Sequence, residues 1–177
     1  MKIALKILIA VVAVICLLLV VALFVKRDYV IYREIVINRS NKEVFEYIRF
    51  QKKQEQYSKW VMADPQMRKK YMGVDGQLGF IYAWDSDVSG VGKGEQEIIN
   101  LVEGERVEMV IRFKEPFENI ATTIMTTQAI ADNQTKVSWS MKGQSIYPMN
   151  LMNSILDDLL GKDLEASLNN LKTILEK

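Results

Sequence analysis

The stretch VEMVIRFKEPFENIATTIMTTQAIADNQTKVSWSM, residues 107–141, decides the fold of this 177-residue chain. Apolar and polar residues alternate at 107–113 and at 137–141, and a long Thr-rich run at 120–130 lies between them. Both patterns are typical of β-strands. Pro116 interrupts the sequence after the first run, and Asp132-Asn133-Gln134 forms a turn after the second. Since neither connection is long enough for a parallel crossover, we expect an antiparallel meander.

The same pattern extends toward the N-terminus. Residues 80–84 alternate with a period of two, and a glycine-rich turn at 89–92 leads to a further strand near 93–101. The β-branched and aromatic run at 29–37 predicts the first strand of the sheet.

Helices flank these strands in the sequence. Residues 38–41 offer N-caps to a short helix, and a second short helix is expected over 51–57, ending near Trp60. A long amphipathic helix closes the chain, with an apolar stripe spaced by three and four at Met152, Leu156, Leu159, Leu160, Leu164, Leu168, Leu171 and Leu175. Gly161 weakens its middle by about 1 kcal/mol relative to Ala and is expected to allow a bend. This order predicts an α+β domain whose curved antiparallel sheet wraps around the final helix.

An uninterrupted apolar run from Ile7 to Val25, without charge, Pro or Gly, precedes these elements. As a helix it would be roughly 28 Å long, close to the ~30 Å hydrocarbon core of a bilayer. We therefore predict a single-pass membrane protein with one transmembrane anchor in residues 1–27 and one domain in residues 28–177. A cleavable export signal is the alternative, but such signals are shorter and end in small residues, whereas Lys26-Arg27 ends this run. Basic residues flank both ends of the run, so the side on which the domain lies stays open.

Local sequences in residues 28–177 resemble a known family. They are IVINRSNKEVFEYI at 35–48, YSKW at 57–60, Asp64-Pro65, Trp84, VGKG at 91–94 and the leucine-rich final helix. In this order they resemble the START-like, SRPBCC superfamily of birch pollen allergens and polyketide cyclases. The resemblance implies the helix-grip fold, with a cavity between the sheet and the long helix that often takes a lipid, sterol, polyketide or other apolar ligand. Arg39-Ser40 replaces the small residue and proline of many members, which loosens a turn without changing the expected fold.

The candidates for the lining of such a cavity share one face of the sheet or lie on the helices that cover it. They are Trp60, Phe80, Tyr82, Trp84, Met109, Ile111, Phe113, Trp139, Met141, Met152 and Leu156. Met and aromatic side chains suit an adaptable apolar pocket. A solid core would show the same stripe, and alternation alone does not separate the two.

Composition limits the chemistry. The chain has no His, and its only Cys, Cys16, lies in the apolar run. Ser–His and Cys–His arrangements and the usual zinc sites are therefore excluded, and a general base would have to be a buried carboxylate, Lys or Tyr. Residues 28–177 hold 19 basic and 22 acidic residues, a net charge of −3, which argues against a nucleic-acid partner. We expect neither a metal nor a cofactor.

Three other patterns have both a functional and a structural explanation. DSDVSG at 85–90 matches part of an EF-hand loop, but Gln96 stands where the bidentate Glu belongs, so we interpret it as a hairpin turn. GVGKG at 90–94 lacks the Ser or Thr and the helix of a phosphate loop. Two basic clusters either face anionic headgroups or are simply solvated; they are Lys52, Lys53, Arg68, Lys69 and Lys70.

The sequence therefore predicts a membrane-anchored binder of a small apolar ligand, lipid or polyketide-like, whose partners are the bilayer and that ligand. Two alternatives remain: a polyketide cyclase- or dehydratase-like enzyme, and a protein-interaction module whose cavity is filled. A cavity of at least ~300 Å³ beneath the long helix would count against the filled module. A titratable side chain with a perturbed pKa inside that cavity would favour the enzyme.

Overall fold

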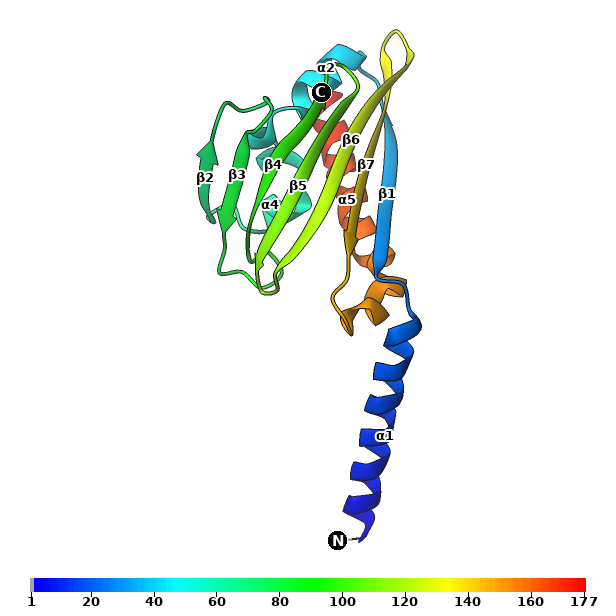
Figure 1. The fold of residues 1–177 in the computed structure, drawn as a ribbon. Helices are drawn as coiled ribbons and strands as arrows, with labels where there is room; N and C mark the ends of the chain where they lie inside the picture. Colours follow the sequence, from blue (N-terminus) through cyan, green and yellow to red (C-terminus); the bar gives the residue numbers. More distant parts are fainter. Residues whose placement is uncertain (1) are drawn as a thin grey trace.

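Seven strands form one antiparallel sheet that curves around the final helix (Figure 1). The computed structural model describes residues 2–177. The strands are β1 (Asp28–Ile37), β2 (Arg68–Met72), β3 (Ile81–Asp85), β4 (Lys93–Val102), β5 (Arg106–Glu115), β6 (Asn119–Ala131) and β7 (Gln134–Gln144). The helices are α1 (Lys2–Phe24), α2 (Asn41–Ile48), η1 (Gln51–Lys53), α3 (Gln54–Tyr57), α4 (Lys59–Ala63), η2 (Met149–Met152) and α5 (Asn153–Leu175). The α+β helix-grip architecture predicted from the sequence is confirmed.

The strands lie in the order β1-β7-β6-β5-β4-β3-β2, so β2 to β7 form the expected meander and β1 joins it beside β7. The first pair of β1 and β7 is Asp28 with Gln144, and the last is Ile37 with Thr135. The edge strand β2 was missing from the sequence-based prediction, because its sequence, RKKYM, is largely charged and has no apolar face. Charged residues are common on exposed edge strands, where they oppose pairing with another chain.

Helix α5 lies across the concave face of the sheet and buries one apolar stripe against it. Leu164, Leu168 and Leu171 are fully buried there, as their spacing predicted. Helix α2 adds its own apolar residues to the same core, and a capping box of Ser40 and Glu43 fixes where this helix begins.

Gly161, in the middle of α5, makes room for a side chain of β1. A Cβ at this position would lie 2.1 Å from Nη2 of Arg33. The Arg33 guanidinium donates to both carboxylate oxygens of Asp157 and to its backbone carbonyl, each at 3.0 Å. The structure thus gives this glycine a steric explanation: its missing side chain lets Arg33 of β1 bind the first half of α5.

The antiparallel topology gives the sheet two distinct ends. One end of the sheet, from which α1 extends, contains the start of β1, the β3–β4 and β5–β6 turns and the β7–η2 connection; we call it the α1 end (Figure 1). The β4–β5 and β6–β7 turns lie at the opposite end, which α2 covers and which we call the α2 end.

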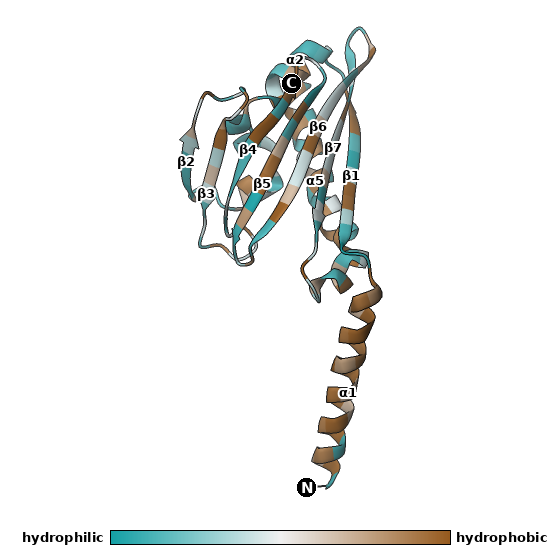
Figure 2. Cartoon of the chain, viewed as in Figure 1, coloured by the Kyte–Doolittle hydropathy of each residue, from teal (hydrophilic) through white to brown (hydrophobic). Residues whose placement is uncertain are grey.

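Helix α1 extends away from the sheet and exposes apolar side chains along its length (Figure 2). By length and composition it could cross a membrane, a criterion that a signal sequence near the N-terminus also meets. Its C-terminal end is fastened to the rest of the chain: Nδ2 of Asn150 donates to the carbonyls of Ala22 (2.6 Å) and Val25 (2.9 Å), and the Tyr147 hydroxyl donates to the carbonyl of Leu19 (3.0 Å). The bond to Ala22 satisfies one of the last four carbonyls of α1, which have no partner within the helix.

Candidate functional site

On the concave face, side chains of paired residues form rows across β3, β4 and β5. One row toward the α2 end contains Phe80, Ile98 and Met109, in which Ile98 pairs with Met109 and the Ile98 backbone N–H donates to the carbonyl of Phe80 at 3.0 Å. All three side chains are fully buried in the main hydrophobic core. At this depth the space under α5 is filled.

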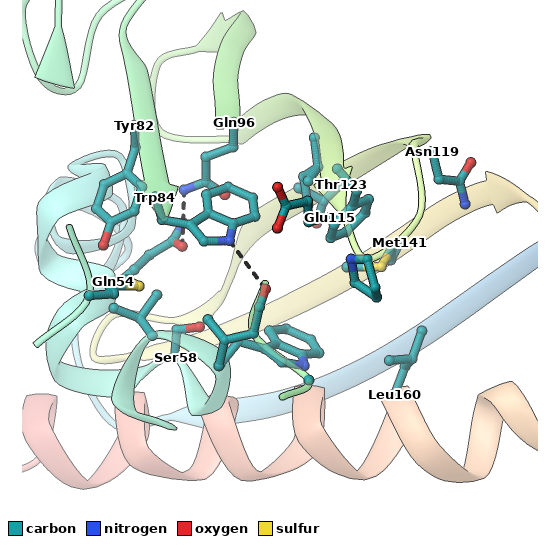
Figure 3. Close-up of a pocket in the computed structure, with 18 of the residues that line it drawn as sticks. Gln54, Ser58, Tyr82, Trp84, Gln96, Glu115, Asn119, Thr123, Met141 and Leu160 are labelled. Atoms are coloured by element: carbon teal, nitrogen blue, oxygen red, sulfur yellow. Dashed lines mark hydrogen bonds between the residues drawn. The ribbon is translucent and has the colours of Figure 1, made fainter. Parts of the chain in front are cut away.

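Nearer the α1 end, the same face borders a cavity of about 350 Å³ between the sheet, α4 and α5 (Figure 3). The next row, Tyr82–Gln96–Ile111, lines its inner end. The following row places Trp84 and Phe113 on either side of Gly94, and these two rings line the cavity closer to its mouth. The lining is therefore mainly apolar and aromatic, as in many small-molecule sites.

Seven of the eleven predicted lining residues border this cavity. They are Trp60, Tyr82, Trp84, Ile111, Phe113, Trp139 and Met141. Their contact with a ligand stays a prediction.

The other four lie elsewhere. Phe80 and Met109 belong to the filled row, because alternation fixes the face of a strand and not the depth along it. Leu156 is partly buried against the core, and Met152 is exposed in η2 beside the end of α1. The residue of α5 that lines the cavity is Leu160, one helical turn beyond Leu156.

Sequence reasoning missed the polar part of the lining. Gln54 and Gln96 are buried and face the inner end of the cavity, together with Ser58. The two glutamines share an amide network with Gln51: Nε2 of Gln96 donates to Oε1 of Gln51 (2.6 Å) and of Gln54 (3.1 Å), and Nε2 of Gln54 donates to Oε1 of Gln51 (2.8 Å). The sequence held one signal of this polar lining. Gln96 lies between Gly94 and Ile98 on the face of β4 that is turned toward the core, where a polar side chain is unusual.

Two tryptophans are held in place by their indole nitrogens. Nε1 of Trp139 donates to the Thr123 hydroxyl at 2.7 Å, and Nε1 of Trp84 donates to the Val91 carbonyl at 3.3 Å. The Trp84 ring lies across Gly94, where a Cβ would come within 2.6 Å of it. The two indole rings are thus positioned by hydrogen bonds to Thr123 and Val91, which also border the cavity, and the Trp84 ring has room because Gly94 has no side chain.

The interior of the cavity carries no formal charge. The titratable side chains in its lining are Tyr29, Tyr82 and Glu115. Burial raises the pKa of Tyr29, and burial, with smaller contributions from nearby Glu55 and Tyr71, raises the pKa of Tyr82 well above its usual range, so both hydroxyls stay protonated near neutral pH. Glu115 is exposed and forms an ion pair with Lys93 at 3.0 Å.

The mouth of the cavity lies at the α1 end. The β3–β4 turn contributes Val91, and the β5–β6 turn contributes Pro116 and Phe117, whose ring is exposed. The two turns touch, since a Cβ on Gly92 (φ +61°) would lie 2.2 Å from the carbonyl oxygen of Glu115. Gly90 and Gly92, both with positive φ, thus form a tight turn.

The other short patterns form contacts within the domain. Arg68 binds Asp85 and Asp87, at 2.9 and 3.1 Å, so both carboxylates of the EF-hand-like segment form ion pairs within the domain. Among residues 2–177, no three His, Cys, Asp or Glu side chains gather in a way that could hold a metal ion. Lys52 and Lys53 lie over aromatic rings at 4.5 Å.

Comparison with known proteins places this geometry in context. The profile of the family described as polyketide cyclase/dehydrase and lipid transport matches residues 30–176. No curated protein matches the chain in sequence. Norcoclaurine synthase from Thalictrum flavum shares the fold with a TM-score of 0.65 and 9% identity, over 87% of this chain and 90% of that one. A protein from Chromobacterium violaceum (TM-score 0.60, 17% identity, 84% and 97% covered) and Ara h 8.0201 (0.55, 12%, 84% and 97%) also share it.

Proposed function

The chain belongs to the polyketide cyclase/dehydrase and lipid transport family, and we propose that it is a membrane-anchored protein that binds a small apolar ligand, lipid or polyketide-like, between the sheet and α5. The observation that carries this proposal is the cavity of about 350 Å³ with its aromatic and aliphatic lining. Such a volume is at the lower end of the range for ligand sites. A molecule of liquid water occupies about 30 Å³. At that volume for each non-hydrogen atom, the cavity has room for about a dozen such atoms. A module with a filled core would leave no such space.

We also propose residues 1–27 as the anchor and residues 28–177 as the ligand-binding domain. Two observations support the anchor: α1 is apolar, and nearly all of it is exposed, which a helix of a soluble core would not be. Large apolar side chains are also exposed on the loops and on α5 at the α1 end, namely Phe117, Ile146, Met149, Met152, Ile155 and Leu159. With α1 in a bilayer, these side chains and the mouth of the cavity would lie at the lipid surface.

An enzyme acting on a hydrophobic substrate is supported less well. A general base needs a pKa near the working pH, whereas the pKa values of both lining tyrosines are shifted upward, away from neutrality. Glu115 lies at the mouth and is paired with Lys93. The polar groups inside are amides and hydroxyls, which suit recognition by hydrogen bonds.

Native mass spectrometry of the full chain tests the proposal. The protein is extracted with its membrane into polymer-bounded discs, without detergent, and is then released in the spectrometer. We expect an apolar molecule of defined mass bound to the wild type and absent from the Leu160→Trp variant, whose larger side chain fills the cavity. Identical adducts on both proteins would contradict the proposal, and circular dichroism of both checks that the variant is folded.

A further inference from the structure

We propose that the ligand carries an uncharged hydrogen-bonding group, such as a hydroxyl or an amide, and that it binds with this group at the inner end of the cavity, against Tyr82 and Ser58. This inference rests on the proposed function and adds the chemical class and the orientation of the ligand. Figure 3 shows the polar side chains Gln54, Ser58, Tyr82 and Gln96 at one end of the cavity and Asn119 and Leu160 at the other. We call these four side chains the inner polar cluster.

The inner polar cluster has hydrogen-bonding groups that the protein does not use. Tyr82 is 1% exposed, and its hydroxyl has no partner in residues 2–177. Ser58 is 2% exposed and lines the cavity, and its hydroxyl makes no hydrogen bond to another group in residues 2–177. Nε2 of Gln51, directly behind the cluster in the amide network, is also without a partner. Buried polar groups are nearly always paired, so unpaired ones around one hollow indicate a polar atom of a ligand.

The hydrogen-bonding groups of the inner polar cluster that have no partner include both donors and acceptors. The Tyr82 and Ser58 hydroxyls can donate a proton or accept one, and both hydrogens of Gln96 Nε2 are already used, which leaves its carbonyl oxygen as an acceptor. A ligand hydroxyl or amide can donate and accept at once and so satisfies both kinds of group. A carboxylate can only accept, and an ammonium can only donate.

Electrostatics also favour an uncharged group. Among residues 2–177, Glu115 at the mouth is the one Lys, Arg, Asp or Glu side chain that lines the cavity. An ionic group at the inner end would therefore lose its hydration without gaining a counter-ion, which is strongly unfavourable. The opposite orientation, with the polar group at the mouth, would leave Tyr82 and Ser58 facing the apolar part of the ligand.

Three probes of nearly equal shape separate these possibilities: 2-naphthol, 2-methylnaphthalene and 2-naphthoate. Binding to the full chain in phosphatidylcholine nanodiscs is measured at pH 7 by titration calorimetry, with the Leu160→Trp variant as the background for partition into lipid. We expect 2-naphthol to bind more tightly than 2-methylnaphthalene by about 2- to 12-fold for each hydrogen bond made. We expect 2-naphthoate to bind more weakly than 2-naphthol.

Tyr82→Phe should remove most of the preference for 2-naphthol and leave the affinity for 2-methylnaphthalene unchanged. Its melting temperature without ligand should be equal to the wild-type value or higher, because the variant lacks a buried hydroxyl without a partner. Ser58→Ala should reduce the same preference independently.

Tyr71→Phe is the matched control: the Tyr71 ring lies 5.4 Å from the Tyr82 ring and outside the cavity, and the Tyr71 hydroxyl already donates to Glu55 at 2.7 Å. The control should keep the wild-type preference.

The outcomes separate the two proposals. If no probe binds the wild type above the Leu160→Trp background, the binding function and this inference are both wrong. If 2-methylnaphthalene or 2-naphthoate binds at least as tightly as 2-naphthol, the cavity binds ligands but the uncharged polar end is wrong. The same conclusion follows if Tyr82→Phe and Ser58→Ala both keep the wild-type preference.

Discussion

The two ends of one concave face differ in how they are filled. At the α2 end, Phe80, Ile98 and Met109 are fully buried in a core to which α2 contributes. At the α1 end, Trp84 and Phe113 occupy the same face of the same strands and border a cavity of about 350 Å³. Both groups follow the same alternation, so the pattern of the strands does not make the difference. The covering helices also differ: α2 packs against β6 and β7 at one end, whereas α1 extends away from the other end (Figure 1).

The largest effect that tests this comparison comes from one substitution made twice on α5. Leu164 is fully buried at the filled part of the face, and Leu160, one turn earlier, lines the cavity. Leu164→Ala should lower the free energy of unfolding by about 2–5 kcal/mol, because it removes packed methyl groups and leaves a new void. Leu160→Ala should lower it by a clearly smaller amount, because it enlarges a void that already exists.

Urea denaturation of both variants, monitored by tryptophan fluorescence, measures the two losses. Both substitutions replace Leu by Ala in the same helix, so helix propensity cancels in the comparison. Equal losses at the two positions would mean that the α1 end is as tightly packed as the α2 end, and the distinction between them would be lost.

A smaller effect is expected where Trp84 crosses β4. Gly94→Ala would place a Cβ 2.6 Å from the Trp84 ring and 2.8 Å from the backbone carbonyl oxygen of Arg112. We expect a loss of about 1–3 kcal/mol in the free energy of unfolding, the usual range for overpacking, together with a displaced ring at the cavity wall.

The double variant with Trp84→Phe tests that explanation. A smaller ring leaves room for the added methyl group, so the two substitutions together should cost less than the sum of their separate costs. Additive losses would assign the effect of Gly94→Ala to the Arg112 carbonyl, and the Trp84 ring would then have no need for a glycine beneath it.

The sequence predicts much of this fold and less of the site, for physical reasons. Alternation in β5 places Met109 and Ile111 on one face, but it does not show that the first lies in the packed core and that the second borders the cavity. Gln54 begins α3 and Ser58 lies between α3 and α4, two short helices whose orientation depends on contacts with α5, including a bond of 2.9 Å from the Lys59 N–H to the Ser167 hydroxyl. Such contacts join residues far apart in the sequence, and no local pattern records them.

The smallest expected effect concerns the ion pair of Arg33 and Asp157, which connects β1 to the first half of α5. Hydrogen bonds from Arg33 lower the pKa of the Asp157 carboxyl below its usual value. A carboxyl with a lowered pKa in the folded state contributes stability above its unfolded pKa, and this contribution is lost as the pH falls through the folded pKa. The midpoint of urea unfolding should therefore be higher in the wild type than in Asp157→Asn at pH 7, and the difference should shrink steadily below about pH 4.

Several other carboxyls titrate in the same range, so only the difference between the two proteins isolates this pair. The pair is exposed to solvent, so the difference should also shrink in high salt. A difference that does not depend on pH would mean that the Asp157 side chain acts through its shape and not through its charge, and that α5 is positioned over the cavity without help from this charge.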